Sequence, residues 1–258
     1  MTNTVLYDSK DAVATITLNR PDSLNSFDAD LRADLISATS EAKDDSAIRA
    51  VVLTGAGRCF SAGADLKAGF KTGSEVEHML VNEYKPSLMN IAEMEKPVIS
   101  AINGFAAGIG LSFAMISDLS IMAESAFLLS PFSSIGLVPD GGATWLLTNG
   151  MGYKQAYELA IENERLPAQR CKELGIINRI AADDVLLSTA QEWATALAQK
   201  APLAMARTKK LMREAHKLDY AAAINSEAAL QNLCIDSRDS REGITAFLEK
   251  RPAVFTGE

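Results

Sequence analysis

The chain has 258 residues, of which 48% are hydrophobic and 22% charged, a composition that can bury a large core and that argues against intrinsic disorder. Its 25 lysines and arginines are outnumbered by 33 aspartates and glutamates, and the resulting net charge of −8 disfavours nucleic acids and anionic membrane surfaces as partners. Since 258 residues exceed the usual size of one compact domain, we expect a large core with an appendage.

The three cysteines, Cys59, Cys171 and Cys234, lie far apart and include no CxxC pair, so the sequence predicts neither a disulfide framework nor a zinc site. The first twenty residues lack the cationic and apolar regions of a secretory signal. No apolar run in the sequence is long enough to span a bilayer. We therefore expect a cytoplasmic protein that neither binds a metal nor crosses a membrane.

Short runs rich in Val, Ile and Leu alternate with helical stretches in the first part of the chain, which predicts an α/β fold. A helix is expected between the first two runs, where Leu31 and Leu35 share an apolar face and Ser26 or Asp28 can act as the N-cap. The SEVE stretch at 74–77 has the spacing of a capping box, which predicts the start of another helix. The predicted strands cover residues 12–18, 49–55, 96–104 and 119–124.

From about residue 190 the strand-like runs stop and amphipathic stretches follow, one of which places Pro202 where a first helical turn favours proline. We therefore predict a core over residues 1–190 and a helical region over residues 191–258. Such a region can cover the core of its own chain or pack on a neighbouring subunit, and the pattern alone favours neither. The expected helices cover residues 188–200, 202–218, 220–235 and 241–251.

Two glycine-rich segments each follow an apolar strand. The first, at 54–69, lacks the Gly-Lys-Ser/Thr of a Walker loop, and the second, at 103–118, fails the GxGxxG pattern because Phe113 occupies the third glycine position. Glycine lets the backbone turn tightly and leaves main-chain N–H groups available to an anion, most of all at the start of a helix. A tight connection between a strand and a helix would have the same composition, so both interpretations stay open.

The second glycine segment also contains a near match to the nucleophile elbow GxSxG, with Ser112 at the serine position. A serine hydrolase needs a histidine beside this serine. The chain has two histidines, His78 and His216, and both lie in predicted helices, where a histidine more often has a surface or packing role. A serine hydrolase acting through Ser112 is therefore an alternative of another class.

One carboxylate, Asp140, stands in the otherwise apolar run at 130–147. Pro139 and Gly141 on either side are typical of a turn, so Asp140 could be an ordinary loop residue. If its apolar neighbours shield it from water, however, they raise its pKa, and a desolvated carboxylate is well suited to removing a proton from carbon. These neighbours are Phe132, Ile135, Leu137, Val138, Trp145 and Leu146.

Four segments together resemble, in the right order, the crotonase superfamily of enoyl-CoA hydratases and isomerases, and the similarity extends over about residues 5–257. The resemblance implies a spiral of ββα turns followed by a helical trimerisation region, assembled as a homotrimer or a dimer of trimers. It also implies an acyl-CoA thioester substrate, with coenzyme A as part of that substrate and no cofactor bound for catalysis. The segments are GRCFSAGADL, KPVISAINGFAAGIGLSFAMISD, SSIGLVPDGGATWLL and REGITAFLEKRPAVFTG.

The resemblance places an oxyanion hole at the backbone N–H groups of Ala64 and Ile109. Two fixed donors would stabilise the enolate that forms when an acyl thioester loses its α-proton. The close backbone approach that such a site demands then explains Gly63, Gly108 and Gly110.

The family binds coenzyme A near the first glycine segment and near the segment after the first strand. The residues implied there are Ser23, Leu24, Ala62, Asp65 and Leu66, with Arg58, Lys67 and Lys71 as a possible cationic rim. Late residues could reach the nucleotide site of a neighbouring subunit, namely Phe247, Lys250 and Phe255. Phe132 and Trp145 are expected to shape the acyl pocket.

Hydratases of the family carry two glutamates, and this sequence has Ser112 and Phe132 at their places. Asp140 instead matches the aspartate in the PDxGG turn of members resembling 1,2-epoxyphenylacetyl-CoA isomerase and Δ3,Δ2-enoyl-CoA isomerases, although the glycine pair comes one place earlier here. We therefore expect an isomerase with Asp140 as its single base. A hydratase or another acyl-CoA conversion using a different carboxylate, and a binding protein without activity, remain as alternatives.

Overall fold

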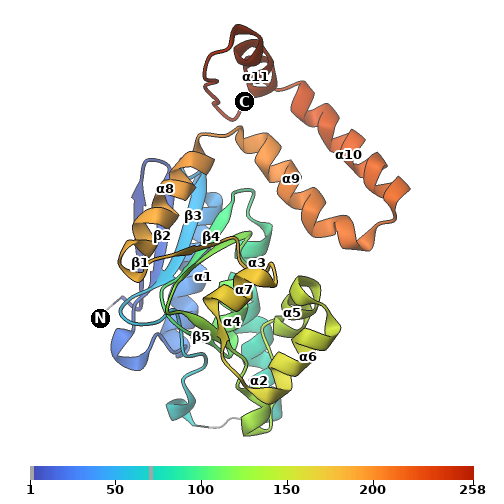
Figure 1. Ribbon diagram of the computed structural model, residues 1–258. Helices are drawn as coiled ribbons and strands as arrows, with labels where there is room; N and C mark the ends of the chain where they lie inside the picture. Colours follow the sequence, from blue (N-terminus) through green and yellow to red (C-terminus); the bar gives the residue numbers. More distant parts are fainter. Residues whose placement is uncertain (1–2, 70–71) are drawn as a thin grey trace.

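A computed structural model describes residues 3–69 and 72–258 (Figure 1). Within these residues the strands form one sheet in the order β1-β2-β3-β4-β6-β9 and a smaller sheet in the order β5-β7-β8. The larger sheet is parallel except for β1, which runs antiparallel to β2. The strands are β1 (Val5–Lys10), β2 (Val13–Leu18), β3 (Ala50–Gly55), β4 (Val98–Ile102), β5 (Ala106–Ala107), β6 (Leu119–Ala123), β7 (Phe127–Leu129), β8 (Leu166–Pro167) and β9 (Arg179–Ala181).

The central strands β2, β3 and β4 are buried along nearly their whole length because helices cover the sheet. Helix α1 (Ala29–Asp44) packs on β1 and β2, and α8 (Leu186–Ala198) packs on β2, β3, β4 and β6. In Figure 1, α8 lies in front of the sheet and α1 behind it. The other helices of the core are α2 (Gly73–Met79), α3 (Lys85–Glu93), α4 (Ile109–Ile116), α5 (Ala143–Met151), α6 (Tyr153–Glu162) and α7 (Ala168–Glu173).

Helices α1 and α2 both begin at a capping residue, but the cap of α2 lies two residues before the predicted one. Asp28, and not Ser26, is the N-cap of α1, because its carboxylate accepts a hydrogen bond of 2.9 Å from the amide of Leu31. The predicted position of the capping box of α2 is wrong by two residues, since the box is formed by Thr72 and Glu75 instead of residues 74 and 77. The amide of Thr72 donates to the Glu75 carboxylate over 2.7 Å. Both pairs fit the same sequence pattern, so the pattern alone could not separate them.

Each predicted strand is present, but the structure adds strands that the sequence analysis did not predict. Strand β1 pairs with β2 through a hairpin in which Asp11 and Ala12 both have positive φ, at 52° and 64°. Strands β5, β7, β8 and β9 have only two or three residues. Such short strands carry too few residues for an alternating pattern to be recognised.

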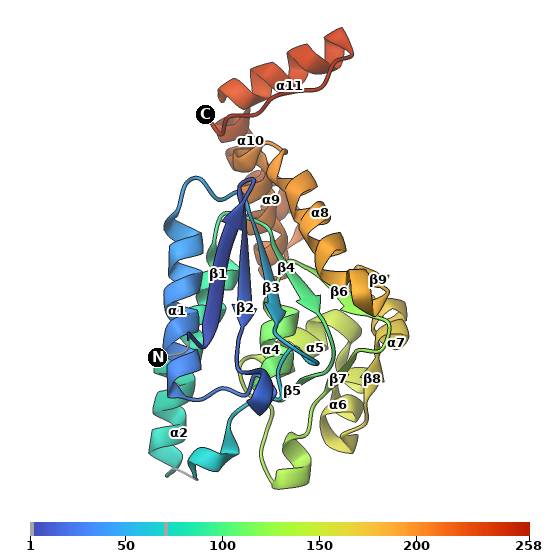
Figure 2. The same ribbon diagram turned by 90° about the vertical axis from the view of Figure 1, so that its left-hand side faces the viewer.

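The expected C-terminal helices are present as α8, α9 (Pro202–Glu214), α10 (Tyr220–Ile235) and α11 (Arg238–Glu249). Helix α8 spans the predicted boundary at residue 190 and lies on the sheet, whereas α9, α10 and α11 extend away from the core (Figures 1 and 2). Helix α10 has no buried residue. Among the helices of the described residues, none combines the length and the apolar character that a membrane crossing requires.

A cluster of charges around Asp118 joins α9 to the core. Its carboxylate accepts from the amide of Val98 at the start of β4 and forms ion pairs of 2.8 Å with Lys209 and Arg213 of α9. The side chain of Lys209 is only 11% exposed, and its ammonium also donates to the carbonyls of Ile91 and Lys96. Burial lowers the pKa of Lys209, and the charge of Asp118 opposes this effect. Asp118 therefore links the start of β4 to two cationic side chains of α9.

We predict that Asp118→Ala lowers the free energy of unfolding by about 3 kcal/mol, because it leaves the buried Lys209 without its counter-charge. Denaturant titration at a fixed protein concentration measures the loss. The matched control is Glu95→Ala, which removes an ion pair between Glu95 and Arg207. Because the Glu95 side chain is 66% exposed, this substitution should lower the free energy of unfolding by less than about 1 kcal/mol. Equal effects of the two substitutions would contradict this explanation of the junction.

Candidate active site

The two glycine-rich segments, 54–69 and 103–118, are far apart in the chain but lie against one another. The carbonyl of Ser61 accepts from the amide of Ala107 over 2.9 Å. A Cβ atom added to Gly63 would lie 2.8 Å from the Ala107 carbonyl oxygen, and one added to Gly110 would lie 2.8 Å from the Cβ of Ser61. Any side chain at these two positions would push the segments apart, which explains why both residues are glycine.

The amides of Ala64 and Ile109 are not donors in any hydrogen bond among the described residues. The amides on either side of Ala64, and that of Gly108, are all bonded within the protein. Ile109 is the first residue of α4, where an N–H group has no partner within the helix. Ala64 itself is exposed. The contact between the segments thus brings two unused donors into the same region of the molecule.

Asp140 lies in a turn that packs on the beginning of α4. The Ser112 hydroxyl donates to the Asp140 carbonyl over 2.9 Å. A Cβ atom on Gly141, which has φ of +59°, would lie 2.2 Å from the Cδ1 of Ile109. Among the described residues, the buried Oδ1 of Asp140 has no hydrogen-bond partner. Burial raises the pKa of this carboxyl to about 6.

The cause of this burial differs in part from the one expected. Four of the apolar neighbours that could shield Asp140 are largely open to solvent: Ile135, Leu137, Val138 and Trp145 are between 47% and 79% exposed. They lie close to the carboxylate in sequence, but the turn directs much of their surface to solvent. Phe132 is buried and lies beside Gly108, with its ring 3.9 Å from a Cβ atom built there. The turn that carries Asp140 is instead buried by its contact with Ile109 and Ser112 of α4.

The residues implied for coenzyme A come together around one loop contact. The carbonyl of Leu24, a residue with φ of +56°, accepts from the amide of Ala62 over 2.9 Å. Ser23 precedes this turn as the last residue of a short 3-10 helix, and Leu66 is 54% exposed. A single surface region therefore contains Ser23, Leu24, Ala62 and Leu66.

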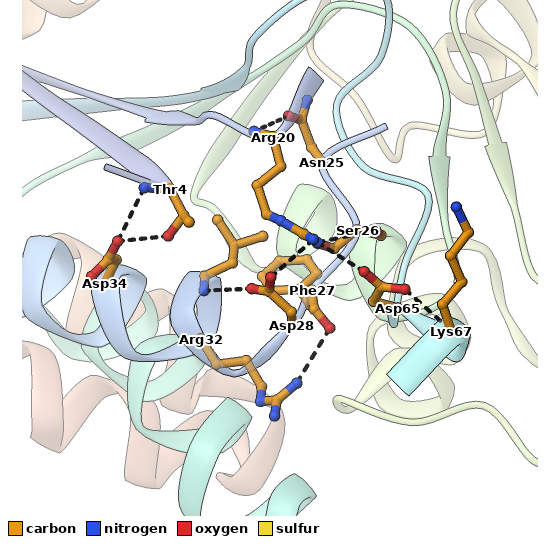
Figure 3. A network of polar contacts seen from close by, with 11 residues as sticks. Thr4, Arg20, Asn25, Ser26, Phe27, Asp28, Arg32, Asp34, Asp65 and Lys67 are labelled. Carbon is orange, nitrogen blue, oxygen red and sulfur yellow. Dashed lines mark hydrogen bonds and ion pairs between the residues drawn. The ribbon is translucent and has the colours of Figure 1, made fainter. Parts of the chain in front are cut away.

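Asp65 has a structural partner in this region. Its carboxylate forms an ion pair of 3.1 Å with Arg20, which also pairs with Asp28 over 2.9 Å (Figure 3). Burial would raise the pKa of Asp65, but hydrogen bonds from Arg20, the Lys67 amide and Ser26, together with the charge of Arg20, outweigh burial and lower that pKa. Arg20 also donates to the Ser26 carbonyl, so one guanidinium joins the segment 26–28 to the first glycine segment. The side chain and the amide of Asp65, which donates to the Phe27 carbonyl, are thus both engaged within the protein.

Sequence reasoning missed Arg20 and Asn25, which hold this loop in place. Asn25 is fully buried with φ of +52°, and its side chain accepts from the amide of Arg20 and donates to the carbonyls of Ala56 and Cys59. A polar residue directly after Pro21-Asp22-Ser23-Leu24 is an ordinary turn signal. Nothing in that signal shows that its amide group reaches the distant first glycine segment.

The expected cationic residues are spread over the molecule. Arg58 and Lys67 are exposed near the first glycine segment, and Lys71 lies outside the described residues. Lys250 ends α11, which lies at the end of the molecule remote from α4 and β5 (Figures 1 and 2). Phe247 is 82% exposed on the same helix, and the carbonyl of Phe255 is bound by Arg49. The structure therefore does not bring Lys250, Phe247 or Phe255 to the site of their own chain.

The geometry gives no support to a serine hydrolase. Ser112 is fully buried and donates to a backbone carbonyl, and neither histidine is its partner among the described residues. His78 lies in α2 and contacts Asn82, whereas His216 packs edge-on against Trp145. Within residues 3–69 and 72–258, no group of three or more His, Cys, Asp or Glu side chains is placed to hold a metal ion.

Comparison with known proteins decides the family. The model of the enoyl-CoA hydratase/isomerase family matches residues 8–258. The chain belongs to the enoyl-CoA hydratase/isomerase family. It is 37% identical to the 1,2-epoxyphenylacetyl-CoA isomerase of Escherichia coli K12, over 98% of both chains. It is also 30% identical to the 2,3-dehydroadipyl-CoA hydratase of the same organism, over 95% of both chains.

Solved structures confirm the crotonase fold. An enoyl-CoA hydratase from Bacillus anthracis has a TM-score of 0.93 and 31% identity, covering 99% of this chain and 100% of the other. An enoyl-CoA hydratase from Polaromonas sp. JS666 has a TM-score of 0.93 and 32% identity, covering 98% and 99%. The relatives include proteins named as isomerases and as hydratases, so the family alone does not select one reaction.

We predict that Gly63→Ala lowers turnover of the family's reaction at least about 100-fold, because the new methyl group displaces the amide of Ala64 from its place beside the second segment. Steady-state kinetics with a CoA thioester measures the loss. Gly175→Ala is the matched control, because Gly175 also has positive φ, at +76°, but no heavy atom of the described residues would lie within 4 Å of its new Cβ. A similar loss in both variants would point to backbone strain instead of displacement of the amide.

Proposed function

We propose that the protein is an acyl-CoA double-bond isomerase that converts a 3-enoyl-CoA, or a related thioester, into its conjugated 2-enoyl isomer. The observation that carries this proposal is a single buried carboxylate oxygen, Oδ1 of Asp140, without a partner among the described residues. Asp140 lies in a turn packed on Ile109, whose amide is unused within the described part of the chain. A base and an oxyanion donor are therefore close in space.

The proposed reaction uses the two unused amides as hydrogen-bond donors and the Asp140 carboxylate as the base. The N–H groups of Ala64 and Ile109 donate to the thioester carbonyl oxygen, and Asp140 removes a proton from C2. The electron pair of that C–H bond moves into the thioester to form a dienolate, which the two amides stabilise more strongly than the neutral carbonyl. The protonated Asp140 then returns its proton to C4, and the double bond comes to lie between C2 and C3.

The pKa of Asp140 suits this role. With a value of about 6, most of the carboxylate is ionised at neutral pH, yet it is a stronger base than an exposed aspartate. Ketosteroid isomerase also combines an aspartate base with an oxyanion hole, which indicates that such a pair of features is chemically sufficient. No second carboxylate is required by the proposed steps.

Two positions favour isomerisation over hydration. Hydration requires an activated water as well as a proton donor, a task that two glutamates share in hydratases of the family. Ser112 and Phe132 stand at those two places, and both are buried beside the proposed site. A serine bonded to a carbonyl and a phenylalanine cannot activate water as carboxylates do. Hydration through a different carboxylate is the second candidate, since relatives at 30% identity or more include named hydratases.

We also propose that α9 to α11 form an assembly surface for a homotrimer or a dimer of trimers, with residues 191–258 as the assembly region. Helix α10 buries none of its residues within the chain, and Tyr220, Phe247 and Leu248 are between 74% and 84% exposed. An apolar groove of about 880 Å³ runs between α9, α10 and α11. Lys250 at the end of α11 would reach a nucleotide site only on a neighbouring subunit.

A cytoplasmic location stays a prediction.

Asp140→Asn should reduce kcat by about 10²- to 10⁴-fold and leave KM nearly unchanged, because the amide cannot take a proton from C2. In deuterated water the variant should lose exchange at C2 and C4 of the thioester, followed by mass spectrometry. The kcat/KM of the unsubstituted protein should rise with pH through about 6, since the base must be ionised.

The control for this experiment is Asp184→Asn, which changes an exposed aspartate outside the site. Full isomerase activity in Asp140→Asn would exclude Asp140 as the base. Hydration of 2-enoyl-CoA at a rate above that of isomerisation would favour the second candidate.

A further inference from the structure

Tyr84 is a buried tyrosine whose hydroxyl donates no hydrogen bond among the described residues. Tyr84 is 1% exposed, whereas Val81, three residues earlier, is 49% exposed. Tyr84 ends a π-helical turn over Leu80–Tyr84, between α2 and α3. Such turns are rare and occur frequently at functional sites, because the extra residue changes which side chain faces inward. Here the turn directs a phenol into the interior.

The ring of Tyr84 lies between two parts of the proposed site. It packs edge-on against Phe27, with ring centres 5.6 Å apart, and Phe27 forms a single β-bridge with Ala64. It also packs against Phe113, at 6.4 Å, and Phe113 directly follows the serine that binds the Asp140 carbonyl. Tyr84 therefore packs on two residues next to the proposed site: Phe27, which is bridged to Ala64, and Phe113, which follows Ser112.

Three charged groups act on Tyr84. The guanidinium of Arg32 lies 5.3 Å from its ring centre and is held by an ion pair of 2.8 Å to Glu83. Burial raises the pKa of Tyr84 to about 12; the charge of Arg32 and a hydrogen-bonding contribution from its N–H groups oppose this, and the charges of Asp140 and Glu83 add to it. The phenol thus keeps its proton at physiological pH. Arg32 cannot accept that proton, because a guanidinium has only donors.

Two complementary groups are therefore left unpaired on segments that both pack on α4, Tyr84 against Phe113 and Asp140 through Ser112. The Tyr84 hydroxyl is a donor without an acceptor, and Oδ1 of Asp140 is an acceptor without a donor, within the described residues. Buried polar groups in native proteins nearly always find partners, so each such atom calls for an explanation. Hydrogen bonds of an active site are often loose without substrate and tighten in the complex.

We propose that Tyr84 is a positioning residue whose hydroxyl donates to the Asp140 carboxylate when an acyl-CoA is bound. The bond holds Oδ1 and leaves the other oxygen free to carry the proton between C2 and C4. This inference rests on the proposed role of Asp140 as the base.

The test is the pH dependence of Tyr84→Phe, which removes one oxygen and keeps the ring. The pH profile of kcat reports the pKa of the base in the substrate complex, and that of kcat/KM reports the free protein. A donor to the carboxylate stabilises its charged form, so losing that donor raises the pKa. In kcat, the acidic limb should move upward by about one pH unit, the size expected for a hydrogen bond to a charged group. In kcat/KM the limb should stay in place.

Tyr7→Phe is the matched control, since the Tyr7 hydroxyl in β1 is also buried and unpaired among the described residues but lies at the edge strand of the sheet. It should leave both profiles unchanged. A kcat profile of Tyr84→Phe that matches the unsubstituted protein would overturn the inference, as would an upward shift of equal size in both profiles, which would place the bond in the free protein.

A measurement independent of turnover separates this inference from the proposed function. Protein labelled with ¹³C at the aspartate carboxyl carbons, with the Asp140 signal assigned from Asp140→Asn, is titrated with a non-reactive acyl-CoA thioether bound. Tyr84→Phe should raise the pKa of that signal by about one unit. Loss of activity in Asp140→Asn without this shift would overturn only the inference about Tyr84. Retained activity in Asp140→Asn would overturn the proposed function instead.

Discussion

The structure of the proposed site depends on the close approach of two backbone segments. Gly63 lies so near the carbonyl of Ala107 that a methyl group would not fit, and Gly110 is equally close to Ser61. This contact uses the amides of neighbouring residues in ordinary hydrogen bonds and leaves those of Ala64 and Ile109 unused among the described residues. Main-chain donors of this kind are rigid, so they can stabilise a developing charge without the cost of reorganisation.

Asp140 complements these donors at a cost to stability. Because burial raises its pKa from 3.8 to about 6, the folded protein holds this proton more tightly than the unfolded chain does. Between these two pH values the unfolded chain ionises first, so the folded state loses stability as the pH rises through that range. A functional group that weakens the fold at neutral pH is expected where reactivity is required. Contact with α4 maintains the carboxylate in this setting.

The sequence predicts the parts of the fold that have strong local patterns. Val- and Ile-rich runs locate the main strands, the candidate N-caps Ser26 and Asp28 and the proline at position 202 locate helix starts, and four segments in order indicate the family. Long-range contacts were not predictable in this way. The network of Asn25, the inward direction of Tyr84 and the exposure of Val138 all depend on how distant segments pack, and no local pattern records that packing. The role assigned to Asp140 stays a prediction.

The most direct test of the central claim is the carbonyl stretching frequency of a bound acyl-CoA thioester, labelled with ¹³C at C1 and followed by difference infrared spectroscopy. If two amides converge on the carbonyl oxygen, they polarise the C=O bond. We then expect a band at lower wavenumber than for the same thioester in water, and a smaller shift in Gly63→Ala. A band at the same wavenumber as in water, with the thioester shown to be bound, would contradict the convergence of the two amides.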